Sequence, residues 1–310
     1  MNIRLTGKSH IERIITYYIY LHVNYKHCRL DKIVSDFTLG VFNNPSKEQE
    51  HIHQLISNEK CNISFNNFNT FKLTKVIGFK QNNSFHYTVY GRGDVSIYQF
   101  TKTIPKILYD NLLTSLNKKC NKSIIIQLVF IYSILGFDTG QFWGVHPNFY
   151  KLVNEHYNVV ECFASPFNHS LINYYSPIDY LDICFGSSGN FFEKFVNASF
   201  DCYVINPPFV LSIMDKVFKL SLLKLENTAK IVIYYYLPYW EDIIDAFINQ
   251  LKKNYVNHHI FKKYETYVHD YINDKDIPNN NFELVVICAS NREHLEPDKI
   301  FTKLIDVIKR

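Results

Sequence analysis

The chain has 310 residues, of which 47% are hydrophobic and 20% are charged. This composition is sufficient to bury a large core, and it excludes whole-chain disorder and a small scaffold held together by disulfides. The 33 basic and 29 acidic residues leave a net charge of +4, which is too weak to hold a polyanion by overall attraction. A nucleic-acid partner would therefore need a local binding patch.

The sequence predicts neither a membrane span nor a secretory signal. Its longest apolar run, residues 124–137, contains Gln127 and is shorter than the roughly 20 residues that a transmembrane helix requires. Residues 1–20 contain no uninterrupted apolar stretch. The seven cysteines are widely spaced and form no C-x-x-C pair, so we expect reduced core cysteines and no metal site. We expect a protein that is neither secreted nor bound to a membrane.

Residues 1–140 are expected to form a mainly helical N-terminal domain with a small β insertion. Apolar residues at helical spacing predict four helices, at residues 10–24, 46–57, 104–116 and 123–135. Between about residues 71 and 100, short β-rich runs separated by turn residues predict a small antiparallel sheet.

Residues 141–310 alternate between apolar runs and helical patterns, which is typical of a doubly wound α/β sheet. The predicted strands are residues 159–163, 181–185, 203–206, 231–236, 260–264 and 282–288. The predicted helices are residues 147–157, 210–225 and 241–252. Because such sheets bind ligands beyond the carboxyl ends of their strands, we expect the functional site to follow Phe163 and Asn206.

The strongest motif is the sequence Asn206-Pro207-Pro208-Phe209, directly after a predicted strand. The Asn206 side-chain oxygen and the Pro207 carbonyl can each accept an N–H of an aromatic amine, which would turn the nitrogen lone pair toward an electrophilic methyl group. The two prolines fix φ and remove backbone donors, and Phe209 offers a flat face for a stacked base. The alternative is a proline-stiffened turn in which Asn206 caps a helix.

A second and weaker signal is the segment 161–168, which ends the first strand of the α/β half. The small residues Ala164 and Ser165 allow a cofactor to approach the backbone closely. Taken alone, this segment is explained better by an ordinary strand followed by an Asn-capped helix.

The chain from about Gln141 to Ser290 resembles the phosphorylated-CTD-interacting-factor family, the cap-specific adenosine N6-methyltransferases of messenger RNA. The matching motifs occur in the family's order: residues 161–168; Asp182 with Phe185, Gly186, Ser187 and Gly189; residues 206–209; Met214 and Asp215; Pro238, Tyr239 and Trp240; and His269 with Tyr271. We see no WW module in the sequence, so we expect the recruitment domain of the animal enzyme to be absent.

The resemblance implies a Rossmann-like class I methyltransferase core that uses S-adenosyl-L-methionine to methylate the N6 amine of the adenosine beside a 7-methylguanosine cap. The implied catalytic residues are Asn206, Pro207, Pro208 and Phe209. The implied cofactor-binding residues are Glu161, Phe163, Ala164, Ser165, Pro166, Asn168, Asp182, Phe185, Gly186, Ser187 and Asn206. The expected substrate contacts are Phe209, Trp240, His269, Tyr271 and Arg92, although Trp240 also suits a buried lid and Arg92 an exposed hairpin turn.

The implied partner is the capped 5′ end of mRNA, held in part by the N-terminal domain. Association with RNA polymerase or a capping enzyme is a further expectation, and no membrane or DNA partner is expected. The abundance of Asn, Ile and Lys suits the AT-rich genome of a large DNA virus or a protist. This leaves the cytoplasm, as a viral replication site, and the nucleus both open.

Two departures from the family keep other interpretations open. Val210, Leu211 and Ser212 stand where the family commonly has acidic residues, and Ser188 replaces an Arg. A catalytically inactive protein on the same fold that binds the RNA cap or a polymerase is therefore an alternative. A DNA adenine or protein glutamine methyltransferase is a third interpretation, which shares the chemistry of residues 206–209 but not the other ordered motifs.

Overall fold

The structure is a computed structural model of the chain. It describes residues 2–3, 72–81, 84–92, 97–120, 124–125, 128–129, 132, 143–176, 179–209, 211–291 and 295–309. The chain divides into two compact units, Met1–Gln141 and Phe142–Arg310, and each is considered by itself. The helices expected at residues 10–24 and 46–57 lie outside the described residues.

The first unit contains an antiparallel sheet in the order β1-β2-β3-β4. Its strands are β1 (Asn2–Ile3), β2 (Lys72–Gln81), β3 (Ser84–Arg92) and β4 (Ile97–Pro105). The sheet predicted for this region is confirmed, and β1 joins it from the start of the chain. Helix α4 (Lys106–Ser115) follows β4 directly and buries Leu108 and Leu112. It begins later than predicted because Ile104 pairs with β3.

Only five residues of the helix expected at 123–135 are described, and all five are helical. They are Ile124, Ile125, Leu128, Val129 and Tyr132, and all except Ile124 are buried. Their spacing places the buried side chains on one face of a helix, as the apolar pattern predicts.

The second unit is built on a five-stranded sheet in the order β6-β7-β8-β12-β9. Its strands are β6 (Val159–Glu161), β7 (Cys202–Ile205), β8 (Val232–Pro238), β9 (Tyr255–Phe261) and β12 (Leu284–Ser290). Strands β6, β7 and β8 are parallel, whereas β12 runs antiparallel to both β8 and β9. Every residue of β7, β8 and β12 is buried, which explains why these strands are continuous apolar runs.

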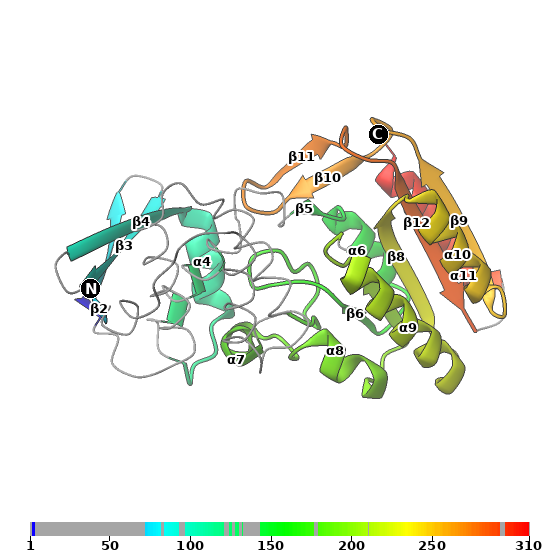
Figure 1. Cartoon of the computed structure of the whole chain (residues 1–310), viewed down its shortest axis with the longest axis horizontal. Coiled ribbons are helices and arrows are strands. Elements are labelled where there is room, and N and C mark those ends of the chain that lie inside the picture. Colours follow the sequence, from blue (N-terminus) through cyan, green and yellow to red (C-terminus); the bar gives the residue numbers. More distant parts are fainter. Residues whose placement is uncertain are drawn as a thin grey trace, which may run out of the picture. The chain divides into compact units, whose positions relative to one another are not determined.

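Helices cover both faces of this sheet (Figure 1). They are α6 (Pro147–Asn154), α9 (Leu211–Asn227), α10 (Glu241–Leu251) and α11 (Leu295–Ile308). On one face α6 and α11 pack together, and Phe149 meets Tyr234 of β8 edge-on. On the other face Phe218 of α9 stacks on Phe247 of α10, which contacts Tyr235. Among the described helices, none combines the length and apolar character needed to span a bilayer.

A separate antiparallel sheet, in the order β11-β10-β5, was not predicted. Its strands are β5 (Trp143–Gly144), β10 (Tyr267–Asp270) and β11 (Lys275–Pro278). His269 of β10 lies opposite Gly144 of β5. The sheet thus joins the first described residues of the second unit to a hairpin near the end of the chain.

The strand predicted at residues 181–185 is wrong, because this segment is helical. Helix α7 (Asp179–Asp182) continues as a 3-10 turn, η3 (Ile183–Phe185). Leu181 and Phe185 are buried while Ile183 is 57% exposed, which fits helical spacing and not strand alternation. Gly186 then ends the helix with a φ of 98°.

The strand expected at 260–264 is displaced. Strand β9 begins at Tyr255 and ends at Phe261, because the chain turns beyond it and Tyr264 has a φ of 69°. This left-handed conformation is incompatible with a β-strand.

The cysteines follow the sequence prediction only in part. Cys162, Cys202 and Cys288 are buried and are not disulfide-bonded. Cys120 and Cys184 are disulfide-bonded, so the expectation that all seven cysteines are reduced is wrong for these two.

Candidate active site

The carboxyl ends of the parallel strands β6, β7 and β8 meet at one edge of the sheet. Glu161 ends β6, Asn206 follows β7, and Trp240 comes shortly after β8. The N–H of Cys162 donates to the carbonyl of Val204 at 2.8 Å, so the pairing of β6 with β7 continues one residue beyond the end of β6. This edge is where an open α/β sheet binds its ligands.

A short extended segment, residues 173–176, joins the two predicted cofactor loops. It bonds along one edge to the loop 161–168 and along the other to the loop 182–189. The hydrogen bonds, donor first, are Glu161 N to Asn173 O (3.0 Å), Tyr175 N to Glu161 O (2.9 Å), Ala164 N to Tyr175 O (3.0 Å), Ser188 N to Tyr174 O (2.8 Å) and Ser176 N to Gly189 O (3.0 Å). Two loops that are separate in sequence are therefore neighbours in the structure.

The loop 161–168 is stabilised by its own side chains. The Ser165 hydroxyl donates to Asn168 Oδ1 at 2.7 Å and accepts the Phe167 N–H at 3.2 Å. Ala164 and Ser165 are buried, whereas Phe163 and Asn168 keep part of their surface exposed. Of the residues predicted in this loop, Phe163 and Asn168 are therefore the ones with side chains accessible to a ligand.

The Glu161 carboxylate is buried and is hydrogen-bonded to backbone N–H groups of a nearby turn. It is 3% exposed, and its Oε2 accepts the N–H groups of Ser170 at 2.8 Å and Leu171 at 3.3 Å. Burial raises the pKa of Glu161 to about 7, although hydrogen bonds from Ser170, Tyr150 and Leu171 oppose the rise. Glu161 therefore holds the turn that follows residues 161–168, and its own oxygens are not directed to solvent.

The loop 182–189 contains two glycines in the left-handed region, Gly186 at a φ of 98° and Gly189 at a φ of 105°. Ser187 is buried and its Oγ lies 2.6 Å from that of Ser176. Asp182 and Phe185 are also buried. A Cβ at Gly186 would meet no atom within 4 Å, so open space adjoins the loop there.

The Asn206 side chain is partly exposed and lies against Gly144 of β5. An ideal Cβ placed on Gly144 would be 3.3 Å from Asn206 Nδ2 and 3.4 Å from the ring of Tyr271. The missing side chain at Gly144 therefore leaves the room that the Asn206 amide occupies. Sequence reasoning did not identify Gly144, because a single Gly after a Trp carries no recognisable pattern.

The remaining residues of the motif differ in exposure. Pro207 is buried, whereas Pro208 and Phe209 are partly exposed. The Phe209 ring meets Phe282 edge-on, with 5.1 Å between centroids and 84° between planes. Phe282 precedes β12, so the ring that was predicted to stack on a base is supported by a residue far along the chain.

The other predicted substrate contacts are placed differently from one another. The Tyr271 hydroxyl donates to the Val145 carbonyl at 2.7 Å and lies 2.8 Å from Ser170 Oγ, so it holds protein segments together. His269 is 7% exposed. Trp240 is partly exposed where α10 begins. Arg92 ends β3 in the other unit, and its side chain lies outside the described residues.

A family model described as "Phosphorylated CTD interacting factor 1 WW domain" matches residues 106–274, which is more than half of the chain. The chain belongs to this family. The match includes both loops and all of residues 206–209. The expectation that the chain lacks the family's WW module is not borne out, because the description of the matching model is that of the WW domain.

The other comparisons add little to this assignment. A solved structure described as "A putative sam-dependent methyltransferase from Streptococcus mutans" aligns with 11% identity and a TM-score of 0.30. The alignment covers 80% of this chain and 66% of that chain, just under two thirds of its length. A likeness this distant carries no argument about function. A search of curated proteins found no match.

Proposed function

We propose that the protein is an S-adenosyl-L-methionine-dependent methyltransferase that modifies the N6 amine of the adenosine beside the cap of messenger RNA. The observation that carries this proposal is the position of residues 206–209 in a chain of this family. They follow β7 at the carboxyl edge of the sheet, where the strand that precedes the loop 161–168 also ends.

The residues at this edge suit the proposed cofactor. Left-handed Gly186 adjoins open space, and the buried small residues Ala164 and Ser165 allow an approach to the backbone. Phe163 and Asn168 supply accessible apolar and polar side chains. When bound, the cofactor would supply the electrophilic methyl group. Several of the predicted cofactor-binding residues are buried and would support the conformation of the loops without touching the cofactor. They include Glu161, Asp182, Phe185 and Ser187.

Asn206 and Pro207 would orient the amine that receives the methyl group. The exocyclic nitrogen of adenine is a poor nucleophile, because its lone pair is delocalised into the ring. Two acceptors, the Asn206 side-chain oxygen and the Pro207 carbonyl, can hold its N–H groups and fix the direction of the lone pair. Gly144 borders the Asn206 amide, and a side chain at this position would crowd it.

Phe209 would hold the base itself. A stacked base is worth about 1–3 kcal/mol, and a ring fixed in orientation loses less freedom when the base binds. The edge-on contact with Phe282 provides this support. We extend the proposal to the capped 5′ end of mRNA as the partner.

A second candidate function is an inactive protein on the same fold that binds the RNA cap or a polymerase. It is favoured by Leu211, which is 56% exposed at the start of α9 where the family commonly has acidic residues. Ser188, in place of the family's Arg, also removes a charge from the loop that would face the cofactor.

A methyl-transfer assay on the full chain tests the proposal. The substrates are capped adenosine-start RNA, the same RNA with a plain triphosphate end, and duplex DNA. We expect transfer to the capped RNA and its loss in Asn206→Ala, while Asn227→Ala at the exposed end of α9 serves as the matched control. Equal rates on both RNAs would contradict cap specificity. No transfer to any substrate, together with retained binding of capped RNA, would favour the inactive protein.

A further inference from the structure

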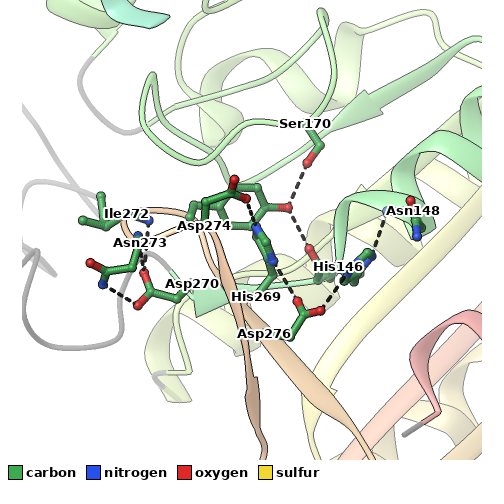
Figure 2. Close-up of polar contacts among 11 residues, drawn as sticks. His146, Asn148, Ser170, His269, Asp270, Ile272, Asn273, Asp274 and Asp276 are labelled. Atoms are coloured by element: carbon green, nitrogen blue, oxygen red, sulfur yellow. Dashed lines mark hydrogen bonds and ion pairs between the residues drawn. The ribbon is translucent and has the colours of Figure 1, made fainter. Parts of the chain in front are cut away.

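Two histidines and an aspartate from three elements meet beside the start of α6 (Figure 2). His146 precedes α6, His269 lies in β10 and Asp276 lies in β11. One ligand atom from each residue lies within 4.8 Å of the other two. We propose that His146, His269 and Asp276 form a binding site for a zinc ion, independent of the proposed methyltransferase activity.

The distances between the donor atoms suit tetrahedral zinc. Bonds of about 2.0–2.1 Å from zinc to nitrogen or oxygen place neighbouring ligand atoms about 3.4 Å apart. His146 Nε2 lies 3.5 Å from Asp276 Oδ2, close to this spacing. His269 Nδ1 is hydrogen-bonded to Asp276 Oδ1 at 2.8 Å, so these two atoms must separate slightly and give up their hydrogen bond when the ion binds. Small rotations of the three side chains would therefore complete the coordination. Nitrogen and carboxylate donors also match the ligand preference of zinc.

Asp274 provides a second and independent indication of a metal. Its Oδ1 lies 3.4 Å from His269 Nε2, the ring nitrogen that faces away from Asp276. A histidine that binds a metal through one nitrogen typically donates the other N–H to a carboxylate, which fixes the ring and its tautomer. Asp274 has a φ of 50°, a left-handed conformation that Asp tolerates, and this turn directs its carboxylate back to His269 (Figure 2).

The turn between β10 and β11 is held by its own hydrogen bonds, so the carboxylates beside His269 are preorganised. Asp270 Oδ1 accepts the N–H groups of Ile272 at 3.0 Å and Asn273 at 3.1 Å. Asp270 Oδ2 accepts the Asn273 side-chain amide at 2.7 Å. Asp270 is therefore occupied in shaping the turn and is not a ligand.

His146 must change one hydrogen bond to bind the ion. Its Nδ1 accepts the N–H of Asn148 at 3.0 Å, so in the metal-free protein the proton of a neutral ring is on Nε2. Coordination through Nε2 moves the proton to Nδ1 and breaks this helix cap. The cap is exposed, so water can accept the freed Asn148 N–H.

The ion would clamp three elements of the second unit together. His269 is 7% exposed, which leaves little room for a substrate beside it. Three protein ligands leave the fourth position to water. Because His269 lies opposite Gly144 in the sheet, zinc would fix the β10–β11 hairpin to β5, next to Asn206.

A metal titration of the tag-free, chelator-treated full chain tests the site. We expect one Co²⁺ per chain with a tetrahedral visible spectrum, displacement by Zn²⁺, and a higher melting temperature with Zn²⁺. His269→Asn should abolish the spectrum, and Asp274→Asn should weaken Zn²⁺ binding about 10–100-fold. His258→Asn, on strand β9 outside the cluster, is the matched control.

Melting curves without metal show which variants are folded. If His269→Asn does not fold, Asp274→Asn tests the site in its place. The proposal is overturned if the wild-type protein gives no tetrahedral spectrum and no shift in melting temperature. It is also overturned if Zn²⁺ binds equally well to wild type, folded His269→Asn and Asp274→Asn, because the ion is then held elsewhere.

Discussion

The buried carboxyl group of Glu161 makes the stability of the second unit depend on pH. Its pKa is raised from 4.5 to about 7 by burial. Below pH 4.5 the group is protonated in both states. Between these values the unfolded chain releases a proton that the folded chain keeps, so the free energy of unfolding falls as the pH rises. The full change is about 3 kcal/mol, and it is complete above the folded-state pKa.

Glu161→Gln should remove this dependence. Glutamine has the shape of protonated glutamic acid, its oxygen can accept the N–H groups of Ser170 and Leu171, and its amide can donate to Tyr150. The stability of the variant relative to wild type should therefore rise by about 2–3 kcal/mol between pH 5 and pH 8. The comparison uses this change with pH, so a constant effect of the substitution on folding cancels.

Urea unfolding measured by tryptophan fluorescence at several pH values provides the assay. Trp143 and Trp240 are the chain's two tryptophans, and both lie in the second unit. Glu226→Gln, at an exposed position of α9, is the matched control and should leave the pH dependence unchanged. A difference between Glu161→Gln and wild type that stays constant from pH 5 to pH 8 would refute the reasoning.

Three further predictions concern methyl transfer. Asn206→Ala should lower the rate at least 100-fold, measured as turnover, while the melting temperature stays the same, because an orienting acceptor is lost from a partly exposed position. Phe209→Ala should weaken binding of capped RNA much more than binding of S-adenosylhomocysteine, and calorimetry that shows the reverse would contradict base stacking. Gly144→Ala should lower turnover roughly 10-fold with unchanged binding of S-adenosylhomocysteine, because the new Cβ lies 3.3 Å from the Asn206 amide. A normal rate in Gly144→Ala would show that the amide adapts.

The sequence predicted elements whose local pattern agrees with their surroundings. Strands β7, β8 and β12 are continuous apolar runs because helices cover both of their faces. Helix α10 was predicted within one residue, since Glu241 and Asp242 occupy its first turn and its apolar residues recur at helical spacing. The antiparallel sheet was predicted at about residues 71–100, because short β-rich runs alternate there with turn residues, and it is found within residues 72–105.

The sequence could not predict features that depend on contacts between distant segments. The apolar run at 181–185 suits a strand or a helix equally, and tertiary packing leaves Ile183 exposed. Strands β10 and β11 carry polar residues without alternation, and they form a sheet through a hairpin and the two residues of β5. The partners of Asn206 and Phe209, which are Gly144 and Phe282, are remote in sequence and belong to no motif.

The position of β12 has a consequence for how the chain is synthesised. Among the described residues, β12 is the last strand along the chain and lies between β8 and β9, and β9 pairs with no other described strand of its sheet. When the ribosome has made residues up to 274, where the family match ends, the edge of β8 is unpaired and β9 has nothing to pair with. A nascent chain or a truncated fragment of that length exposes the edge of the apolar strand β8, and leaves β9 unpaired, so both are open to aggregation. Expression of the second unit therefore requires the residues through Ser290, even though the recognisable family sequence stops earlier.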